Sequence, residues 1–526
     1  MKCWLAIFVL AVVAALALRL PELDRRPMHN DESVNAIKFG ELWERGSYQY
    51  DPTEHHGPTL HYFTAAFLKL TGAPDFKQLS EVHLRIVTAI AGVLLVLLLP
   101  LARDALGRGA VGAAAIFTAL SPVMVFYSRY WIHEQLLVLF TFVALAAGWN
   151  FLRKPSWPWA VLTGLAFGLM HATKETFVFV IAAAAGAVVL NGLWRRFGEP
   201  TPNPSKEGNL KSDAQLCGVP LLGGVRGGFP LVLLALAVWL CVWAALFTSF
   251  FTNWTGLLDS FRTYKAWGSL AGQHSVHAHE GSFYFERLFW FKQGRGHFWS
   301  EGLLLILAIV GASDSFRRTP RNEGDAGFVR FLFFLTVLLA GIYAVIPYKT
   351  PWCALGFAHG MILLAGVGAV VLWKAGKSMI SRCAVIAVLV LGTAHLGWQA
   401  WRSSFPLCAD RANPWVYGQT SPDLLNLVEA VQDIAKSGEG DATLISVVTA
   451  GGDCWPLPWY LRQFDDAGWW EDRLGDTSAP ILIASAKLNL RLDASGDYVM
   501  AGYYQLRSRV FLELYVERKL WEKSVK

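Results

Sequence analysis

Charged residues are scarce in this sequence: Asp, Glu, Lys and Arg together make up 16% of its 526 residues, where a soluble domain usually has about 25%. Hydrophobic residues make up 54%, the mean hydropathy is +0.37, and there are 23 Trp and 33 Phe. This composition excludes an intrinsically disordered chain and argues against an ordinary cytosolic enzyme. Because hydrophobic stretches close to twenty residues long recur along the chain, lipid must be the solvent for much of the protein.

Cysteine patterns typical of zinc or redox chemistry are also missing. The seven cysteines form no C-x-x-C pair and show no spacing typical of zinc ligands. Most of them lie in or beside apolar runs, where a buried cysteine acts as a small hydrophobic residue. Cys408 and Cys454 are the two that fall in the C-terminal part, and a disulfide between them is an open alternative.

Eleven apolar segments are candidates for membrane-spanning helices, because roughly 20 apolar residues cross the hydrocarbon core of a bilayer. They are residues 3–20, 83–102, 109–127, 132–152, 158–173, 176–194, 229–251, 299–315, 330–347, 352–373 and 383–401. With a cytoplasmic N-terminus, every inner junction is basic, so we interpret the net charge of +6 as an orientation signal rather than as nucleic-acid binding. The sequence therefore predicts a multi-pass protein of the plasma (inner) membrane.

The first segment has a second interpretation as a signal peptide, since Ala15-Leu16-Ala17 resembles a cleavage site. Cleavage would leave the remaining topology unchanged. We favour the interpretation in which this segment is the first helix of the bundle.

The chain divides into a transmembrane part, residues 1–402, and an extracytoplasmic part, residues 403–526. Three segments of the first part are expected to lie outside the spans: a long outer loop at 21–82, a flexible cytoplasmic insertion at 195–228 and an outer loop at 252–298. The C-terminal part combines helical spacing with strand-like apolar runs, which predicts a small α/β domain.

Two adjacent carboxylates, Asp31 and Glu32, lie in the first outer loop about ten residues beyond the first span. One interpretation is structural, because Asp31 could cap the helix that follows. The other is catalytic, because a carboxylate at an apolar interface can act as a general base that deprotonates an acceptor hydroxyl or amine.

The same loop continues with Glu54-His55-His56-Gly57-Pro58 and then His61-Tyr62. A histidine pair before Gly-Pro, followed by an aromatic amphipathic stretch, suits an interfacial helix. A solvated turn is the alternative for the two histidines, and a metal site is less favoured because adjacent histidines rarely bind the same ion.

Further polar residues lie at the predicted outer ends of later spans. Lys174-Glu175 would be costly so near the hydrocarbon unless the pair is solvated or used. Tyr348-Lys349 places a compact cation at headgroup depth, which suits a lipid phosphate, although an interface anchor is the structural alternative.

The ordered set Asp31-Glu32, His56-Gly57-Pro58 and His61-Tyr62, followed by many spans and an outer domain, resembles the GT-C glycosyltransferases that use polyprenyl-phosphate sugars. This superfamily includes protein O-mannosyltransferases and lipid A aminoarabinose transferases, and the chain is most similar to its flippase-associated membrane proteins. The resemblance covers roughly residues 1–400 and implies a GT-C-like bundle. In the superfamily an Asp-Glu pair of the first outer loop is catalytic and a Lys-Pro-Pro-type motif follows it; here His56 stands where many relatives have Lys.

The resemblance implies roles for further outer residues. The donor's lipid phosphate is expected at His55, His56, Arg129, Tyr348 and Lys349. Contacts with the donor or the acceptor are expected from Glu54, Glu134, Lys174, Glu175, Arg262 and His279. The superfamily does not require a metal for this step, so no cofactor is expected, although His274, His277 and His279 have a spacing that could bind zinc.

The expected function is therefore an inverting transfer of a hexosyl or pentosyl group from a polyprenyl-phosphate donor to an extracytoplasmic acceptor. The acceptor could be a glycan, a lipid or a protein. Two alternatives stay open: a flippase-associated component that moves a lipid-linked glycan, and a noncatalytic scaffold of envelope glycan assembly.

Overall fold

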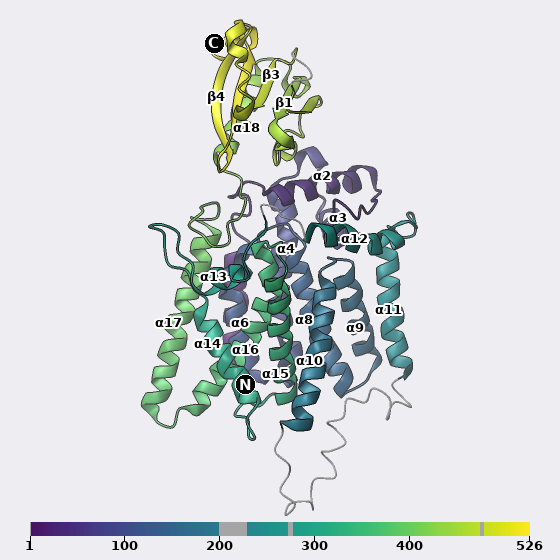
Figure 1. The fold of residues 1–526 in the computed structure, drawn as a ribbon, viewed down its shortest axis with the longest axis vertical. Coiled ribbons are helices and arrows are strands. Elements are labelled where there is room, and N and C mark those ends of the chain that lie inside the picture. The colour runs from purple at the N-terminus through teal and green to yellow at the C-terminus, as the bar shows by residue number, and fades with distance from the viewer. Residues whose placement is uncertain (1, 199–228, 272–276, 474–477) are drawn as a thin grey trace, which may run out of the picture.

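The structure is a computed structural model that describes residues 2–198, 229–271, 277–473 and 478–526. Helices form a bundle, and a small sheet lies beyond one of its ends (Figure 1). His274 and most of the insertion expected at 195–228 lie outside the described residues. Its beginning belongs to a helix, α10, which continues to Phe197.

Each of the eleven predicted spans has a helical counterpart, and the bounds are as follows. The helices are α1 (Lys2–Arg19), α4 (Glu81–Leu98), α6 (Arg108–Leu120) with α7 (Pro122–Ser128), α8 (Glu134–Arg153), α9 (Trp157–His171), α10 (Phe177–Phe197), α11 (Phe229–Phe247), α14 (Gly302–Ser315), α15 (Ala326–Val345), α16 (Leu355–Ala375) and α17 (Met379–Ser404). Short helices η2 (Leu99–Ala102) and α5 (Arg103–Leu106) extend α4, and η4 (Pro351–Ala354) precedes α16.

The expected count of eleven membrane-spanning helices is not confirmed. Within the described ranges, seven helices are long and apolar enough to cross a membrane, and an eighth is added if α6 and α7 form one span bent by 58°. The bend falls at Ser121-Pro122, where proline cannot donate the helical hydrogen bond. Helix α14 has 14 residues, so it extends only about 21 Å, short of the roughly 30 Å of hydrocarbon.

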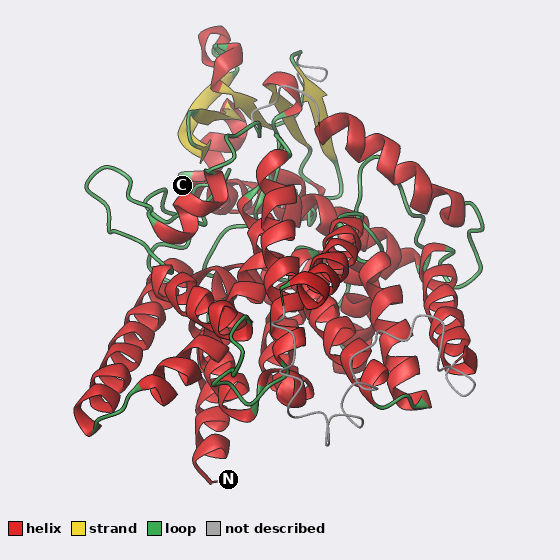
Figure 2. Cartoon of the chain, turned by 60° about the horizontal axis from the view of Figure 1, so that its bottom comes forward, coloured by secondary structure: helices red, strands yellow, loops and turns green. Residues whose placement is uncertain are grey.

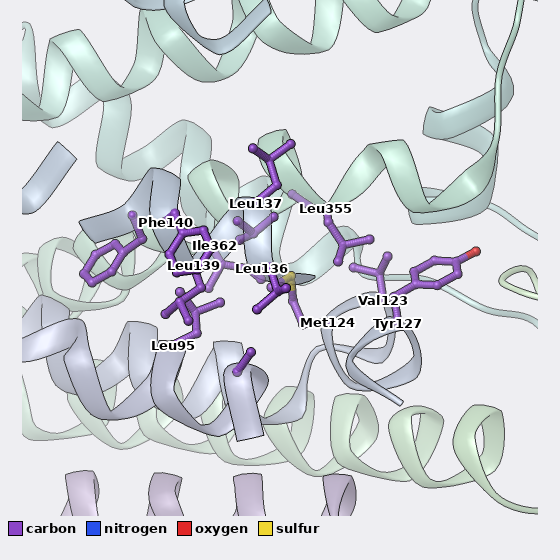
Figure 3. Close-up of a cluster of buried hydrophobic side chains, with 14 of the residues drawn as sticks. Leu95, Val123, Met124, Tyr127, Leu136, Leu137, Leu139, Phe140, Leu355 and Ile362 are labelled. Carbon is purple, nitrogen blue, oxygen red and sulfur yellow. The ribbon is translucent and has the colours of Figure 1, made fainter. Parts of the chain in front are cut away.

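The membrane bundle has a core of buried aliphatic and aromatic side chains. Figure 3 shows part of it, with Leu95 of α4, Val123 and Met124 of α7, Leu136 of α8 and Ile362 of α16 packed together. Helices α14 and α16 approach even more closely, because a Cβ on Gly368 would lie 1.8 Å from the Leu307 carbonyl oxygen. Small residues allow such backbone contact between membrane helices.

Four shorter helices belong to the outer loops: α2 (Asn30–Arg45), α3 (Thr59–Thr71), α12 (Gly256–Ala271) and α13 (Phe283–Phe289). Of these, α2, α3 and α12 lie at the end of the bundle that is nearest the sheet (Figure 1). The short helix η1 (Phe76–Gln78) joins α3 to α4. Two parts of the first outer loop therefore fold back across the ends of the spans.

The C-terminal part is a small α/β domain, as predicted (Figure 2). Its strands are β1 (Ile445–Thr449), β2 (Ala467–Glu471), β3 (Ile481–Ser485), β4 (Tyr498–Arg507) and β5 (Val510–Glu517), in the order β2-β1-β3-β5-β4. Strand β1 is parallel to β2 and β3, while β5 is antiparallel to β3 and β4. Helices α18 (Asp423–Lys436), α19 (Leu457–Tyr460) and α20 (Arg518–Ser524) complete it. The short helices are η5 (Gly440–Ala442), η6 (Ala450–Gly452), η7 (Ala486–Leu488) and η8 (Leu492–Ser495). Cys408 and Cys454 are both free thiols.

Candidate active site

The first turn of α2 carries both carboxylates of the Asp31-Glu32 pair. The helix is capped by His29, whose Nδ1 accepts from the Asp31 backbone N–H at 3.1 Å, while the His29 N–H donates to Glu32 at 2.9 Å. This reciprocal arrangement satisfies backbone groups that a helix start leaves open. Asp31 is therefore not the cap, and its side chain stays available.

Glu32 is fully buried and surrounded by donors. Arg85 of α4 donates to both of its carboxylate oxygens at 2.7 Å, Arg26 donates at 3.0 Å, and the Trp131 N–H donates at 2.9 Å. Burial alone would raise the pKa of Glu32, but the two arginines hold it well below its usual value. A carboxylate with all of its acceptor positions used is suited to fixing α2 against α4, not to taking a proton from a substrate.

Asp31 points the other way, into a cavity of about 420 Å³. Its side chain is 44% exposed. The cavity is lined by α2 and α12, by residues at or just before the starts of α8 and α10, and by the end of α15 with the connection through η4. Its ionisable lining consists of Asp31, Glu54, His56, His133, Glu134, Lys174 and Glu175, and its aromatic lining includes Tyr264, Trp267, Tyr343, Tyr348 and Trp352.

Lys174 is the cation of this cavity. It lies between α9 and α10, is buried, and forms an ion pair with Glu134 at the start of α8. Burial alone would lower the pKa of Lys174, but the Glu134 carboxylate outweighs this and raises it above its usual value. The ammonium group therefore stays charged in a partly dry site, where its electrostatic interactions are stronger than in water.

His56 and Glu175 form a second pair beside it. His56 Nδ1 donates to the Glu175 carboxylate at 3.0 Å, and the imidazole ring lies 4.6 Å from Trp267. Burial favours the neutral form of Glu175, yet His56 and Lys174 lower its pKa below the usual value. A carboxylate that orients an imidazole in this way fixes which ring nitrogen faces the cavity.

Gly57 explains the His56-Gly57-Pro58 motif. A Cβ at this position would lie 2.2 Å from the Ala172 carbonyl oxygen, so only glycine lets the first outer loop approach the α9–α10 connection so closely. The same carbonyl accepts from the Thr59 N–H at 3.1 Å. This contact places His56 next to Glu175 and Lys174, which are more than a hundred residues later in the chain.

Several predicted site residues do not line the cavity. Arg129 donates to the carbonyls of Leu18, Arg19, Pro21 and Glu22, so its charge is used to hold the end of α1. Lys349 is buried and donates to the carbonyls of His279 and Ile346, although its neighbour Tyr348 does line the cavity. His55 is also absent from the lining.

The remaining predicted contacts lie in the 252–298 loop. Arg262 is exposed and pairs with Asp259 at 3.0 Å. His277 and His279 both contact the Tyr417 hydroxyl, at 2.8 and 2.9 Å. Within the described part of the chain, no group of three His, Cys, Asp or Glu side chains could hold a metal ion.

Three parts of the site were not found from the sequence. Arg85 and Arg26, which hold Glu32, carry no local signal of that role, because Arg85 opens a span 53 residues away. His133, which precedes Glu134, donates from Nε2 to the Gly57 carbonyl at 3.0 Å, and its neighbours in the sequence give no sign of this contact. Trp267 reaches the cavity beside Tyr264 because α12 turns one face toward it, whereas the sequence predicts a loop at 252–298.

Comparison with known proteins agrees with this architecture. Residues 55–203 match the dolichyl-phosphate-mannose-protein mannosyltransferase family, and a search of curated protein sequences finds no significant match. ArnT from Cupriavidus metallidurans bound to undecaprenyl phosphate is similar, with a TM-score of 0.60 and 13% identity over 97% of this chain and 98% of that chain. Oligosaccharyltransferase AglB from Archaeoglobus fulgidus has a TM-score of 0.51 and 13% identity, over 99% and 77% of the two chains. This multi-pass membrane protein has the fold of the GT-C glycosyltransferases.

Proposed function

We propose that the protein transfers a sugar from a polyprenyl-phosphate donor to an acceptor at the extracytoplasmic membrane surface. The observation that carries this proposal is the cavity itself: a solvent-accessible carboxylate, Asp31, and a buried cation, Lys174, both line a space of about 420 Å³. Glycosyl transfer needs a base for the acceptor and a cation for the departing phosphate.

The proposed reaction is a single displacement. Asp31 accepts the proton of an acceptor hydroxyl, and the acceptor oxygen forms a bond to the anomeric carbon from the face opposite the phosphate. The bond between the anomeric carbon and the phosphate oxygen breaks, and its electron pair stays on the phosphate. Attack from the opposite face inverts the anomeric configuration. The products are a glycosylated acceptor and a polyprenyl phosphate.

Lys174 and His56 are the proposed partners of that phosphate. Lys174 stays charged beside Glu134, and His56 is oriented by Glu175 on the same wall of the cavity. Neutralising the charge that builds up on a leaving phosphate is worth most where water is excluded. A histidine held by a carboxylate therefore takes the place in which many GT-C relatives have a lysine.

The walls of the cavity also suit a lipid-linked donor. Val178 and Phe179 of α10, together with Tyr343 and Ile346 at the end of α15, form its apolar side near the membrane. A polyprenyl tail that remains in the bilayer gains about 0.8 kcal/mol for each buried CH₂. ArnT of Cupriavidus metallidurans binds undecaprenyl phosphate and AglB of Archaeoglobus fulgidus was seen with dolichol-phosphate, which supports a donor of this class.

Replacing Asp31 by Asn tests the proposal. The substitution keeps the shape of the side chain but removes the base, so transfer should fall by about 10²- to 10⁴-fold. Mass spectrometry of envelope glycans and glycoproteins, in cells that depend on the variant, measures the product. Asp24→Asn is the matched control, because Asp24 is an exposed carboxylate of the same loop and does not line the cavity. Normal glycan products with the Asp31 variant, at normal protein levels, would refute the proposal.

A further inference from the structure

The linker between α17 and α18, residues 405–421, returns across the outer face and contacts the first outer loop. Gln419 donates to the Pro27 carbonyl at 3.1 Å, and Thr420 donates to the Met28 carbonyl at 2.7 Å. The Tyr127 hydroxyl donates to the Trp415 carbonyl at 2.8 Å. The linker therefore packs against the segment that precedes Asp31, although Thr420 and Met28 are 392 positions apart in the sequence.

Tyr417 is the centre of this linker. Its hydroxyl lies 2.8 Å from His277 Nδ1 and 2.9 Å from His279 Nε2. The two histidines therefore hold the hydroxyl end of the Tyr417 side chain. Its carbonyl oxygen lies 2.9 Å from His29 Nε2. Its ring also lies against Trp352, which lines the cavity. Tyr417 of the linker thus contacts both the 252–298 loop, through His277 and His279, and the start of α2, through His29.

His29 connects Tyr417 to Asp31, because one of its ring nitrogens contacts each residue. A carbonyl can only accept, so Nε2 carries the hydrogen and donates to Tyr417. A backbone N–H can only donate, so Nδ1 is unprotonated and accepts from Asp31. The His29 side chain is 5% exposed. It is held between Tyr417 on one side and the Asp31 backbone on the other.

A helix cap alone does not account for histidine at this position. Asn, Asp and Ser are the preferred caps, and each is short enough to accept from the second or third backbone N–H. None of them could also reach the Tyr417 carbonyl on the far side. The residue present is the one whose second nitrogen extends beyond the cap to the linker.

We propose that Tyr417 is a positioning residue for Asp31, acting through His29, so that the linker of the extracytoplasmic domain sets the direction of the proposed base. This inference rests on the proposed function. Misplacement of a reacting group by about 1 Å can cost 100-fold in rate. A link of two hydrogen bonds between the linker and the Asp31 backbone is short enough to control the position of the carboxylate on that scale.

Two substitutions of His29 separate its two contacts in the full-length protein. His29→Asn keeps an oxygen at the place of Nδ1, and so keeps the cap, but cannot reach Tyr417. His29→Gln keeps a donor at the place of Nε2 and so keeps the link. We expect the transfer rate of the Asn variant to fall roughly 10- to 100-fold. The Gln variant should retain more of the wild-type rate than the Asn variant does. Tyr417→Phe, which frees the aromatic ring from His277 and His279, should lower the rate in the same direction as His29→Asn.

The measurements are the rate of transfer at several donor concentrations, the melting temperature, and the binding of undecaprenyl phosphate. A positioning role predicts a lower maximal rate with unchanged affinity for undecaprenyl phosphate and an unchanged melting temperature in His29→Asn. Equal losses in the Asn and Gln variants, or full activity in His29→Asn, would overturn the inference. These outcomes are independent of Asp31→Asn: loss of transfer in that variant with normal His29 and Tyr417 variants refutes the positioning role alone.

Discussion

At the scale of the residue, Asp31 and Glu32 are neighbours on one helix, but their side chains lie in different surroundings. Successive residues of a helix differ by about 100° in direction, so two adjacent carboxylates cannot face the same surroundings. Glu32 is turned toward α4 and two arginines, while Asp31 faces the cavity. The sequence indicates a functional pair, but the choice between its members depends on Arg85, which is distant in sequence and becomes visible only in the fold.

Glu32→Gln should destabilise the protein by about 3–5 kcal/mol at pH 7, because it leaves buried arginine charge unpaired. The pKa of Glu32 in the folded protein lies below its usual value of 4.5. Its contribution to stability is therefore complete above pH 4.5 and is lost as the pH falls through the folded-state pKa. Unfolding in detergent, followed at pH 7 and at acidic pH, should show the difference between wild type and variant shrinking on acidification. A pH-independent difference would contradict this account.

At the scale of the element, apolar run lengths predict where helices form better than whether each one crosses the bilayer. Every predicted span has a helix, yet α9 and α14 have only 15 and 14 residues, and α6 and α7 are bent at Pro122. Hydropathy measures how favourably side chains transfer to lipid, so it does not detect a short helix or a bend at a proline. Helix α12 was expected as part of a loop, because its polar residues obscure the face that it turns to the cavity.

The α14–α16 contact allows a matched test of helix packing. Gly368→Leu would drive a side chain into the Leu307 carbonyl and should destabilise the bundle by roughly 1–3 kcal/mol or more. Gly341→Leu on α15 is the control, because nothing lies within 4 Å of a Cβ there. The melting temperature in detergent should fall for the first variant and change little for the second. An equal fall in both would show that tight packing of these glycines does not limit stability.

At the scale of the whole molecule, the basic junctions between spans and the position of the sheet are both consistent with the orientation that the sequence predicts. The N-terminus lies at the end of the bundle opposite the sheet domain (Figure 1). The cavity is lined in part by α2 and α12, and both helices lie at the end of the bundle that is nearest the sheet (Figure 1). The contacts that join the two parts, such as Trp459 Nε1 to Glu81 at 3.0 Å and Tyr460 to Met28 at 2.8 Å, have no signature in local sequence. They give Trp459 and Tyr460 of the aromatic-rich segment 454–462 partners on α4 and in the first outer loop.

Labelling of single cysteines tests the proposed orientation. Asp465→Cys in the α/β domain should react with a membrane-impermeant thiol reagent applied to intact cells, whereas Asp104→Cys, beside α5, should not. The two aspartates are a matched pair, since their side chains are 60% and 62% exposed. Labelling above the wild-type background is the measurement. Reaction at position 104 with protection at position 465 would reverse the topology.

The return of the linker to the first outer loop has a consequence for biosynthesis. The ribosome finishes the Asp31 segment long before it makes Tyr417, which lies 388 positions after its hydrogen-bonded partner His29. Until the residues that follow α17 have been made and folded, the start of α2 lacks a neighbour that it has in the finished protein. A nascent or prematurely terminated chain would thus lack the contact that we propose to position Asp31, so incomplete copies would not carry out the proposed reaction.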